Sequence, residues 1–259
     1  MSEGKKASII TVTNQKGGVG KTTSAVNIAY YLAKAGKTVL LVDLDPQGNA
    51  TSGLGIDKNT LEDTMSEVVL QKVPITSVVL KTDHKNLWLA PTTPHLANTE
   101  AQLAGMQSKF TRLRQALATI EDQFDFIIID SPPSLSLLTV NGLIAAKYVL
   151  IPVQAEFYAM EGLGQLLETM KLVRKGMNTG LEIIGVLPTM VDSRTTLSKQ
   201  VVEEIKRNFG AKVFNSEIPR NIRLAEAPSH GVPVGAYDRW SRGARAYKSA
   251  AKEVIDRVS

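Results

Sequence analysis

The sequence predicts a single-domain α/β fold, in which helices flank both faces of a doubly wound, mostly parallel twisted sheet. Nearly continuous apolar runs alternate with stretches of helical periodicity along the 259 residues, a pattern typical of parallel sheets that are covered on both faces. A glycine-rich segment over residues 16–20 separates the first apolar run from the first helix. No repeat, low-complexity segment or linker divides the chain. We therefore expect one domain over residues 1–259, with residues 1–6 as a flexible N-terminus.

The order of the elements follows from the apolar runs and their breakers. The first strand is expected over residues 9–13, and the helix that follows, over 23–35, ends at Gly36. The short strand over 87–90 is closed by Pro91. Further strands are expected over residues 38–42, 126–129, 148–153 and 183–187. Further helices are expected over residues 98–121, 161–176, 196–208 and 243–257.

Composition excludes several classes of protein. Hydrophobic residues make up 43% of the chain and charged residues 21%, which is ordinary for a globular domain. The absence of cysteine excludes disulfides, thiolate metal sites and cysteine nucleophiles. No apolar run reaches the length of a membrane span, and the start of the chain does not resemble a signal peptide. We therefore expect a soluble cytoplasmic protein without stable membrane insertion.

The net charge of +5 is concentrated in the last third of the chain. Residues 1–184 hold 17 Lys+Arg and 17 Asp+Glu, whereas residues 185–259 hold 13 Lys+Arg and 8 Asp+Glu. A basic excess in one region favours an anionic partner, although many surfaces are mildly basic.

A phosphate-binding loop is indicated by the run Lys16-Gly17-Gly18-Val19-Gly20-Lys21-Thr22-Thr23. Glycines allow backbone N–H groups to turn toward an anion, and the start of the next helix adds its partial positive charge. Lys21 can then reach the β- and γ-phosphates of a nucleotide, and the Thr22 hydroxyl can bind Mg²⁺. The standard pattern has a glycine where this chain has Gln15, and Lys16 is an additional cation. Composition alone favours a solvated turn lysine at position 16; the alternative is a second cation for the phosphates.

Carboxylates follow two of the predicted strands. Asp43 and Asp45 come directly after the second strand, and Asp130 ends the most apolar strand of the chain. Because the carboxyl ends of parallel strands form the ligand crevice of an open α/β sheet, these side chains are expected beside the loop. A strand that ends in an aspartate is a Walker-B pattern, in which the carboxylate lies beside Mg²⁺.

The run from Asn14 to Thr23 resembles the deviant phosphate loop of the ParA/MinD ATPases, a branch of the P-loop NTPases with a deviant Walker A motif. The resemblance implies that ATP and Mg²⁺ are the cofactors and that Lys16 crosses a homodimer interface to the ATP of the partner subunit. It implies that Asp45 positions or activates the attacking water, and that Asp43 lies nearer the outer shell of the metal. The implied catalytic residues are Lys16, Lys21 and Asp45. The implied metal residues are Thr22, Asp130 and Asp43. The implied nucleotide-binding residues are Lys16, Gly17, Gly18, Val19, Gly20, Lys21, Thr22, Thr23, Pro219 and Asn221.

Further segments are similar to the ParA branch in its short form, often called Soj. They include residues 47–55, 218–231 and 241–244. The resemblance implies a homodimer in the ATP state, which binds double-stranded DNA without sequence preference and works with a ParB-like centromere-binding partner. It also implies a nucleoid-associated location and slow, partner-stimulated hydrolysis in chromosome or plasmid segregation. The candidate DNA-binding residues are Arg194, Lys199, Arg220, Arg223 and Arg242.

Alternatives of the same fold stay open on sequence grounds. A MinD-like ATPase would bind a membrane surface, but the apolar face of the predicted last helix is too small for firm insertion. A kinase using the same loop, or an ATPase that positions another cargo, is also compatible with the sequence. Trp240 is expected to be a packing residue that anchors the last helix.

Overall fold

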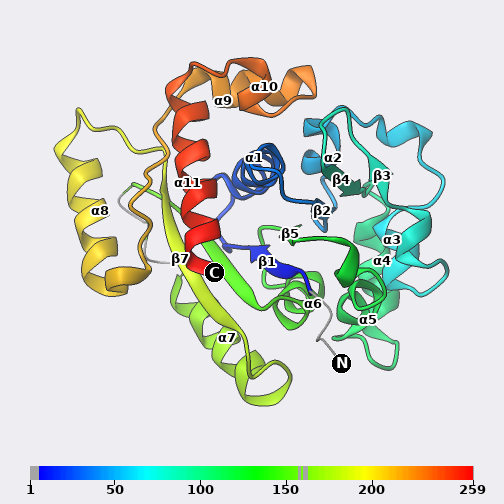
Figure 1. Ribbon diagram of the computed structural model, residues 1–259. Helices are drawn as coiled ribbons and strands as arrows, with labels where there is room; N and C mark the ends of the chain where they lie inside the picture. The colour runs from blue at the N-terminus through cyan, green and yellow to red at the C-terminus, as the bar shows by residue number, and fades with distance from the viewer. Residues whose placement is uncertain (1–5, 157–158, 160–162, 259) are drawn as a thin grey trace, which may run out of the picture.

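The predicted strands form one twisted sheet in the computed structural model, which describes residues 6–156, 159 and 163–258 (Figure 1). Within this part of the chain the strand order is β3-β4-β2-β5-β1-β6-β7, and every pairing except that of β3 with β4 is parallel. The strands are β1 (Ser8–Val12), β2 (Val39–Asp43), β3 (Leu80–Lys81), β4 (Leu87–Ala90), β5 (Phe126–Asp130), β6 (Tyr148–Gln154) and β7 (Glu182–Thr189). The predicted fold class is therefore confirmed, and the antiparallel edge strand β3 accounts for the description as mostly parallel.

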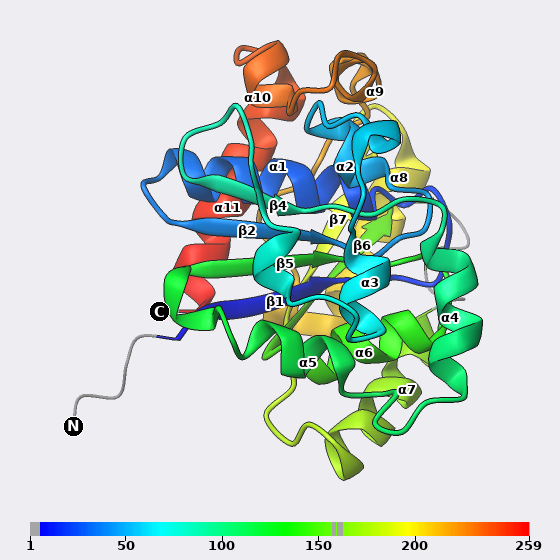
Figure 2. The same ribbon diagram turned by 90° about the vertical axis from the view of Figure 1, so that its right-hand side faces the viewer.

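Helices cover both faces of the sheet, as Figures 1 and 2 show. The helices are α1 (Lys21–Lys34), α2 (Asn49–Gly53), α3 (Met65–Val69), α4 (Leu96–Ala104), α5 (Arg112–Leu117), α6 (Leu137–Ala145), α7 (Leu163–Gly176), α8 (Thr196–Phe209), α9 (Ile222–Glu226), α10 (Val234–Tyr237) and α11 (Arg242–Val258). Short 3₁₀ turns lie at Lys58–Thr60, Ile75–Ser77, Glu121–Gln123, Gly210–Lys212 and Ala227–His230. Residues 1–5 of the predicted flexible N-terminus, and residues 161–162 of the helix predicted over 161–176, lie outside the described residues.

The core has two halves, one on each face of the sheet. Successive residues of a strand point to opposite faces, so that Ile127 and Ile129 of β5 join one half and Ile128 the other. One half includes residues of α3 to α8 and the other residues of α1, α2 and α11.

The last helix, α11, packs on α1, where the Ser24 and Tyr247 hydroxyls are 3.0 Å apart. In the described part of the chain no helix is both long and apolar enough to cross a bilayer.

The prediction of a single helix over residues 98–121 is wrong. The chain forms α4 and α5, and between them Ser108 adopts a left-handed backbone with φ of 58°. A non-glycine residue in this conformation ends a right-handed helix. The pattern also does not predict α6, whose first turn is capped by the Ser136 hydroxyl accepting from the Leu138 N–H at 3.3 Å.

The sheet brings the candidate site together at the carboxyl ends of three neighbouring strands. β5 lies between β2 and β1, and Asp130 is the register partner of both Asp43 and Val12. The loop after β1 therefore starts beside the two strand-terminal carboxylates, at the edge where ligands bind in open α/β sheets.

Candidate nucleotide site and family

The loop between β1 and α1 is shaped by two glycines and held by a distant strand. Gly18 and Gly20 have φ of 75° and 86°, a left-handed conformation that glycine adopts without a steric penalty. Between them Val19 is 1% exposed, and its carbonyl accepts a hydrogen bond from the Thr189 hydroxyl at the end of β7, at 2.8 Å. The loop is therefore curved around the start of α1 and fixed there, as a phosphate cradle requires.

The two lysines of the loop occupy different environments. Lys21 is only 6% exposed, and its ammonium donates to the Lys16 carbonyl at 3.1 Å. Burial lowers the pKa of Lys21, and the negative charges of Asp130 and Asp45 oppose this effect. The side chain of Lys16 is partly exposed, and its ammonium has no hydrogen-bond or ion-pair partner within the described residues. Lys21 thus belongs to the interior of the loop and Lys16 to its outer surface.

Asp130 is a fully buried carboxylate beside the Thr22 hydroxyl, which lowers its pKa without outweighing burial. Its two oxygens are both buried and have no hydrogen-bond partner among the described residues. Burial, followed by the charge of Asp43, raises the pKa of Asp130 well above its ordinary value. A bound cation in contact with this carboxylate, directly or through water, would relieve the unfavourable burial. Asp130 therefore fits a magnesium site.

Asp43 is equally buried, but its oxygens are already engaged. One oxygen accepts from the N–H and hydroxyl of Thr51, at 2.8 and 2.7 Å, and the other from the N–H of Asp45 at 3.2 Å. Burial raises the pKa of Asp43 to about 7 despite these donors. Asp43 therefore holds the loop that carries Asp45, and its predicted contribution to the outer shell of the metal stays a prediction.

Asp45 lies at the start of that loop and is 6% exposed. Its carboxylate accepts from the Gln47 N–H at 3.0 Å, and its carbonyl accepts from the Gly48 N–H at 2.8 Å. These bonds close a tight turn that fixes the carboxylate beside the phosphate loop. Such a fixed carboxylate can orient a water molecule for attack on a terminal phosphate.

The metal ligands available here suit magnesium better than a metal that needs a protein cage. Within the described residues no group of three or more His, Cys, Asp or Glu side chains could enclose a metal ion. Magnesium usually takes one or two protein ligands and fills its other positions with phosphate oxygens and water. The Thr22 hydroxyl, in the first turn of α1, and Asp130 would be such ligands.

Two hollows flank the start of α1 and share Thr23 and Leu224. The first, of about 290 Å³, is bounded by Gly20, Met190, Pro219 and Asn221, and the side-chain amide oxygen of Asn221 is buried without a partner among the described residues. The structure thus brings the two residues predicted to contact the nucleotide, Pro219 and Asn221, beside the phosphate loop.

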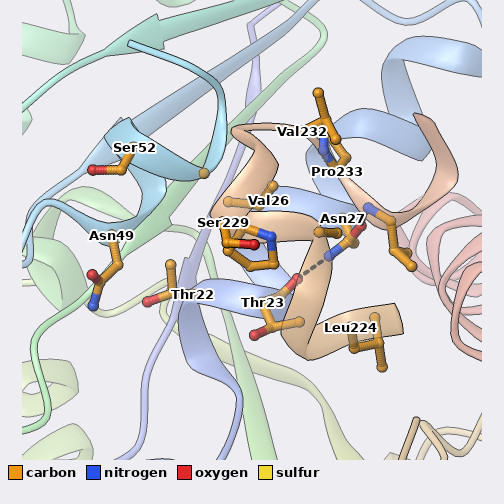
Figure 3. Close-up of a pocket in the computed structure, with 14 residues that line it drawn as sticks. Thr22, Thr23, Val26, Asn27, Asn49, Ser52, Leu224, Ser229, Val232 and Pro233 are labelled. Carbon is orange, nitrogen blue, oxygen red and sulfur yellow. Dashed lines mark hydrogen bonds between the residues drawn. The ribbon is translucent and has the colours of Figure 1, made fainter. Parts of the chain in front are cut away.

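The second hollow, of about 410 Å³, lies between the first turn of α1, α2 and residues 224–234, as Figure 3 shows. Asn27 forms part of its wall: its amide donates to the Thr23 carbonyl at 2.8 Å and accepts from the Val234 N–H at 2.8 Å. This pair of bonds ties α10 to α1.

Comparison with known proteins identifies the family. A profile of the family described as AAA domain matches residues 7–183. The chain is 53% identical to the sporulation initiation inhibitor protein Soj of Bacillus subtilis over 246 residues, which cover 95% of this chain and 97% of that protein. It is 48% identical over 248 residues to the chromosome-partitioning ATPase Soj of Treponema pallidum, with 96% and 97% covered. The chain belongs to the Soj/ParA family of chromosome-partitioning ATPases.

A solved structure that is 38% identical to this chain supports ATP and Mg²⁺ as the cofactors. It is named cobyrinic acid a,c-diamide synthase, comes from Mycobacterium smegmatis, and carries an ATP analogue and magnesium. Its TM-score to this chain is 0.85, with 96% of this chain and 94% of that chain covered. The Soj relatives are more similar in sequence, at 48–53% identity. ATP and Mg²⁺ are accordingly the cofactors of this Soj/ParA site.

The arginines predicted to bind DNA are exposed, but three of the five cationic candidates already have carboxylate partners. Arg194 pairs with Asp192 at 2.8 Å, Arg220 with Glu156 at 2.8 Å, and Arg223 with Glu226 at 2.8 Å. The Arg194 guanidinium holds the pKa of the Asp192 carboxyl well below its usual range. Lys199 on α8 and Arg242 on α11 are exposed and have no ion pair within the described part of the chain.

Two of these candidates gather near one hollow. The loop after β7 and the segment before α9 are joined by the Val191–Pro219 bridge and by the Arg220 N–H, which donates to the Val191 carbonyl at 3.2 Å. A hollow of about 280 Å³ between these segments and α11 is bounded by Ser193, Pro219, Arg242 and Arg245. Arg220 and Arg242 therefore lie on neighbouring segments of one Soj/ParA surface, although they are distant in sequence.

The expectation for Trp240 is wrong. Its side chain is 73% exposed and does not pack into the core. The last helix is anchored instead by Tyr247, which is 1% exposed and contacts Ser24. An aromatic residue near the start of a helix gives no local indication of whether it faces the core, because burial depends on the neighbouring elements.

Sequence reasoning also missed three residues that position the site. Thr51 binds Asp43, Thr189 binds the loop at Val19, and the Asn14 amide donates to the Pro152 carbonyl at 2.7 Å while accepting from the Lys16 N–H at 3.1 Å. All three are polar and at most 2% exposed. A polar residue directly after a buried strand, such as Asn14, was the only available sequence signal.

Proposed function

We propose that this chain is a Mg-ATP-dependent dimerising switch that drives chromosome or plasmid segregation. ATP joins two copies face to face, the dimer binds double-stranded DNA irrespective of sequence, and a ParB-like partner stimulates hydrolysis and release. The observation that carries the proposal is the contrast between Lys16 and Lys21 in one loop, of which only Lys21 is turned inward.

The environment of Lys16 supports the dimer. A partly exposed lysine whose ammonium has no partner in the part of the chain that the structure describes, and which is backed by a fixed loop, is available to a second anion. Lys21 already serves the nucleotide of its own subunit, so the natural target of Lys16 is the triphosphate bound by the facing subunit. Two such contacts, one from each copy, would make dimerisation depend on the γ-phosphate.

The position of Asp45 supports slow hydrolysis coupled to this switch. Its carboxylate accepts from the Gln47 N–H of its own turn, and its N–H donates to Asp43. Positioning of water is then the main contribution of the free protein to catalysis. We expect slow intrinsic turnover, which a partner accelerates by completing or closing the site.

The basic C-terminal third supports binding to DNA. Phosphate contacts by Arg194, Lys199, Arg220, Arg223 and Arg242 would carry no base information, so binding should weaken steeply with salt and ignore sequence. A protein that binds DNA in this way would be found in the cytoplasm on the nucleoid while it holds ATP. The identity of its partner decides whether the cargo is a chromosome, a plasmid or another body.

The test uses Asp45→Ala to retain ATP. With Mg-ATP, this variant should elute as a dimer and bind a random-sequence duplex at low salt, whereas it should be monomeric with ADP. Adding Lys16→Ala should abolish the dimer and the DNA binding together. Lys72→Ala, which removes an exposed lysine outside the loop, is the matched control and should change neither. A dimer that persists without Lys16, or a trapped protein that does not bind DNA, contradicts the proposal.

A further inference from the structure

Two large apolar side chains are exposed among the arginines of this surface. Trp240 is 73% exposed and lies between Arg239 and Arg242 in the sequence, and Ile222, the first residue of α9, is 68% exposed. Single exposed apolar residues are common on soluble proteins. An exposed tryptophan bracketed by arginines is less so, and it has the composition of a nucleic-acid contact.

The turn that carries Trp240 is rigid. The Asp238 carboxylate accepts from the Trp240 N–H at 3.0 Å, and the Asp238 carbonyl accepts from the Ser241 N–H at 3.2 Å. The Ser241 hydroxyl in turn accepts from the Ala244 N–H at 3.1 Å at the start of α11. The indole is therefore presented from a fixed backbone and does not hang from a flexible segment.

The same turn is tied to α9. The second carboxylate oxygen of Asp238 lies 3.4 Å from the Arg223 guanidinium. A Cβ placed on Gly243 would meet the Leu224 side chain at 2.7 Å, so only glycine allows α11 to approach α9 this closely. Trp240 and Arg223 consequently keep a fixed spacing, which favours simultaneous contact with one rigid ligand.

Arg239 stacks on the exposed indole. The central carbon of its guanidinium is 4.7 Å from the centroid of the Trp240 ring. Stacking uses the flat face of the guanidinium and leaves its N–H groups free at the edge to bind phosphate. The pair thus combines an aromatic surface with a cation in a single projecting unit.

We propose that Trp240 contacts DNA directly in the ATP-bound protein, packing on sugar and base edges while the neighbouring arginines hold phosphates. This rests on the DNA binding proposed above and adds a contact of a different chemical kind. Charge favours DNA over a protein partner, because Arg239, Arg242 and Arg245 have no ion pair within the described residues. These three cations and the indole form an apolar and positive surface, which matches a polyanion that carries flat bases.

An aromatic contact and a phosphate contact differ in how they respond to salt. Losing a phosphate contact lowers the dependence of log affinity on log salt by about one unit, because one fewer counterion is released. Losing an indole that packs on sugar and bases releases no counterion. Trp240→Ala should therefore weaken binding about tenfold at every salt concentration, since burying a large aromatic side chain against the ligand is worth about an order of magnitude or more.

The experiment measures anisotropy of a labelled random-sequence duplex across a salt series, with the full chain, Mg-ATP and Asp45→Ala in every sample. Trp240→Ala should give a line parallel to that of the parent and displaced by about tenfold. Trp240→Phe should recover part of the loss, and Arg242→Ala should change the slope. Leu172→Ala is the matched control, because Leu172 is 71% exposed on α7, at the opposite end of the molecule from α9 and α10 (Figures 1 and 2). It should leave both slope and position unchanged.

A second measurement reports on the indole itself. The other tryptophan, Trp88, packs on Phe124 with ring centroids 5.7 Å apart. Replacing it by Trp88→Phe keeps an aromatic ring there and leaves the exposed Trp240 as the one tryptophan whose fluorescence is measured. The fluorescence of Trp240 should be quenched by DNA with ATP and stay unchanged with ADP.

If the parent binds DNA but Trp240→Ala binds equally well, or if Trp240→Ala changes only the slope of the salt series, the inference is overturned while the proposed function stands. If the parent does not bind DNA, both fail. A variant that loses only stimulation by the partner protein would assign Trp240 to a protein interface and also overturn the inference.

Discussion

The nucleotide site and the surface that carries Arg194, Arg220 and Arg223, here called the arginine surface, use charge in opposite ways. At the nucleotide site, the oxygens of Asp130 are buried without a geometric hydrogen bond within the described residues, and Lys21 is buried against a carbonyl. On the arginine surface, Arg194, Arg220 and Arg223 are exposed and each already holds a carboxylate of the same chain. The nucleotide site keeps a buried carboxylate without a geometric hydrogen bond in the described part of the chain, whereas the other region keeps exposed charges whose partners must be exchanged.

The difference has a consequence for affinity and for reversibility. A buried, unsatisfied charged group is costly, so a ligand that satisfies it gains a large share of its binding free energy there. An exposed arginine that exchanges an aspartate for a phosphate gains little per contact. Tight nucleotide binding combined with weak, salt-sensitive DNA binding would suit the switch proposed above, which releases DNA after each cycle.

Asp130→Asn should have the largest effect and tests the first half of the comparison. The neutral amide cannot support Mg²⁺, so Mg-dependent ATP hydrolysis should fall by about a hundredfold or more. The nucleotide-free protein should be at least as stable as the parent in thermal unfolding, because a costly buried carboxylate is removed. Asp122→Asn, at an exposed position of the turn before β5, is the control. A variant that hydrolyses ATP normally, or that unfolds without nucleotide, breaks the comparison.

Arg257→Ala should have the next largest effect, because the ion pair and hydrogen bonds of Arg257 stabilise the fold and are not exchanged for a ligand. Arg257 on α11 donates to the carbonyls of Ile184 and Val213 at 2.8 and 2.7 Å, pairs with Glu253 at 2.8 Å, and stacks on Phe214. Its side chain is only 18% exposed. Removing it should lower the free energy of unfolding by about 2–4 kcal/mol, because several charge-assisted bonds are lost and their carbonyls are left buried. Denaturant unfolding measures this.

The control for Arg257→Ala lies on the same helix. Lys252 is exposed, and Lys252→Ala should change stability by less than about 0.5 kcal/mol. An Arg257→Ala protein as stable as the parent but impaired in DNA binding would place Arg257 with the exchangeable arginines, contrary to its contacts.

The parts of the site that sequence could predict are those formed by neighbouring residues in the chain. The loop from Lys16 to Thr22 and the carboxylate of Asp130 each belong to one strand and its end, and the topology of a parallel sheet brings strand ends to one edge. The fold class follows from the same apolar runs.

The parts that sequence could not predict depend on distant segments. Thr51 engages Asp43 only because α2 returns to the end of β2, and Glu156 reaches Arg220 across 64 positions. Ser108 interrupts the predicted long helix through a backbone conformation that its residue type rarely adopts. Exposure of Trp240 depends on how α11 approaches α9, which no local pattern specifies.

Asp192→Asn should have a smaller effect and tests the exchange on the arginine surface. Asp192 binds the Arg194 guanidinium through two bonds of 2.9 and 2.8 Å. Neutralising it frees Arg194 and removes a charge that repels phosphate, so DNA affinity in the ATP state should rise about two- to fivefold at low salt. Arg194→Gln should lower the affinity instead. Glu203→Gln, on α8 with an exposed pair to Arg207 at 3.8 Å, is the control for removing any surface carboxylate. Equal gains in DNA affinity for Asp192→Asn and Glu203→Gln would show that the affinity responds to net charge alone and not to the release of Arg194.

The smallest expected effect concerns Glu253, which tests whether a half-buried carboxylate with partners behaves unlike Asp130. Burial raises the pKa of Glu253, but the N–H groups of Asn215 and Ser216 and the Arg257 guanidinium outweigh it and lower the pKa below its ordinary value. A carboxylate with a lowered folded-state pKa stabilises the fold above its unfolded pKa of about 4.3, and this stabilisation is lost as the pH falls through the folded-state value. Glu253→Gln should therefore lower the melting temperature by roughly 2–3 °C at neutral pH. The deficit should shrink below about pH 4, where the parent also becomes protonated. A deficit that stays constant from pH 7 to pH 3 would mean that the amide fails for steric reasons and that the charge of Glu253 does not stabilise the contact between α11 and residues 215–216.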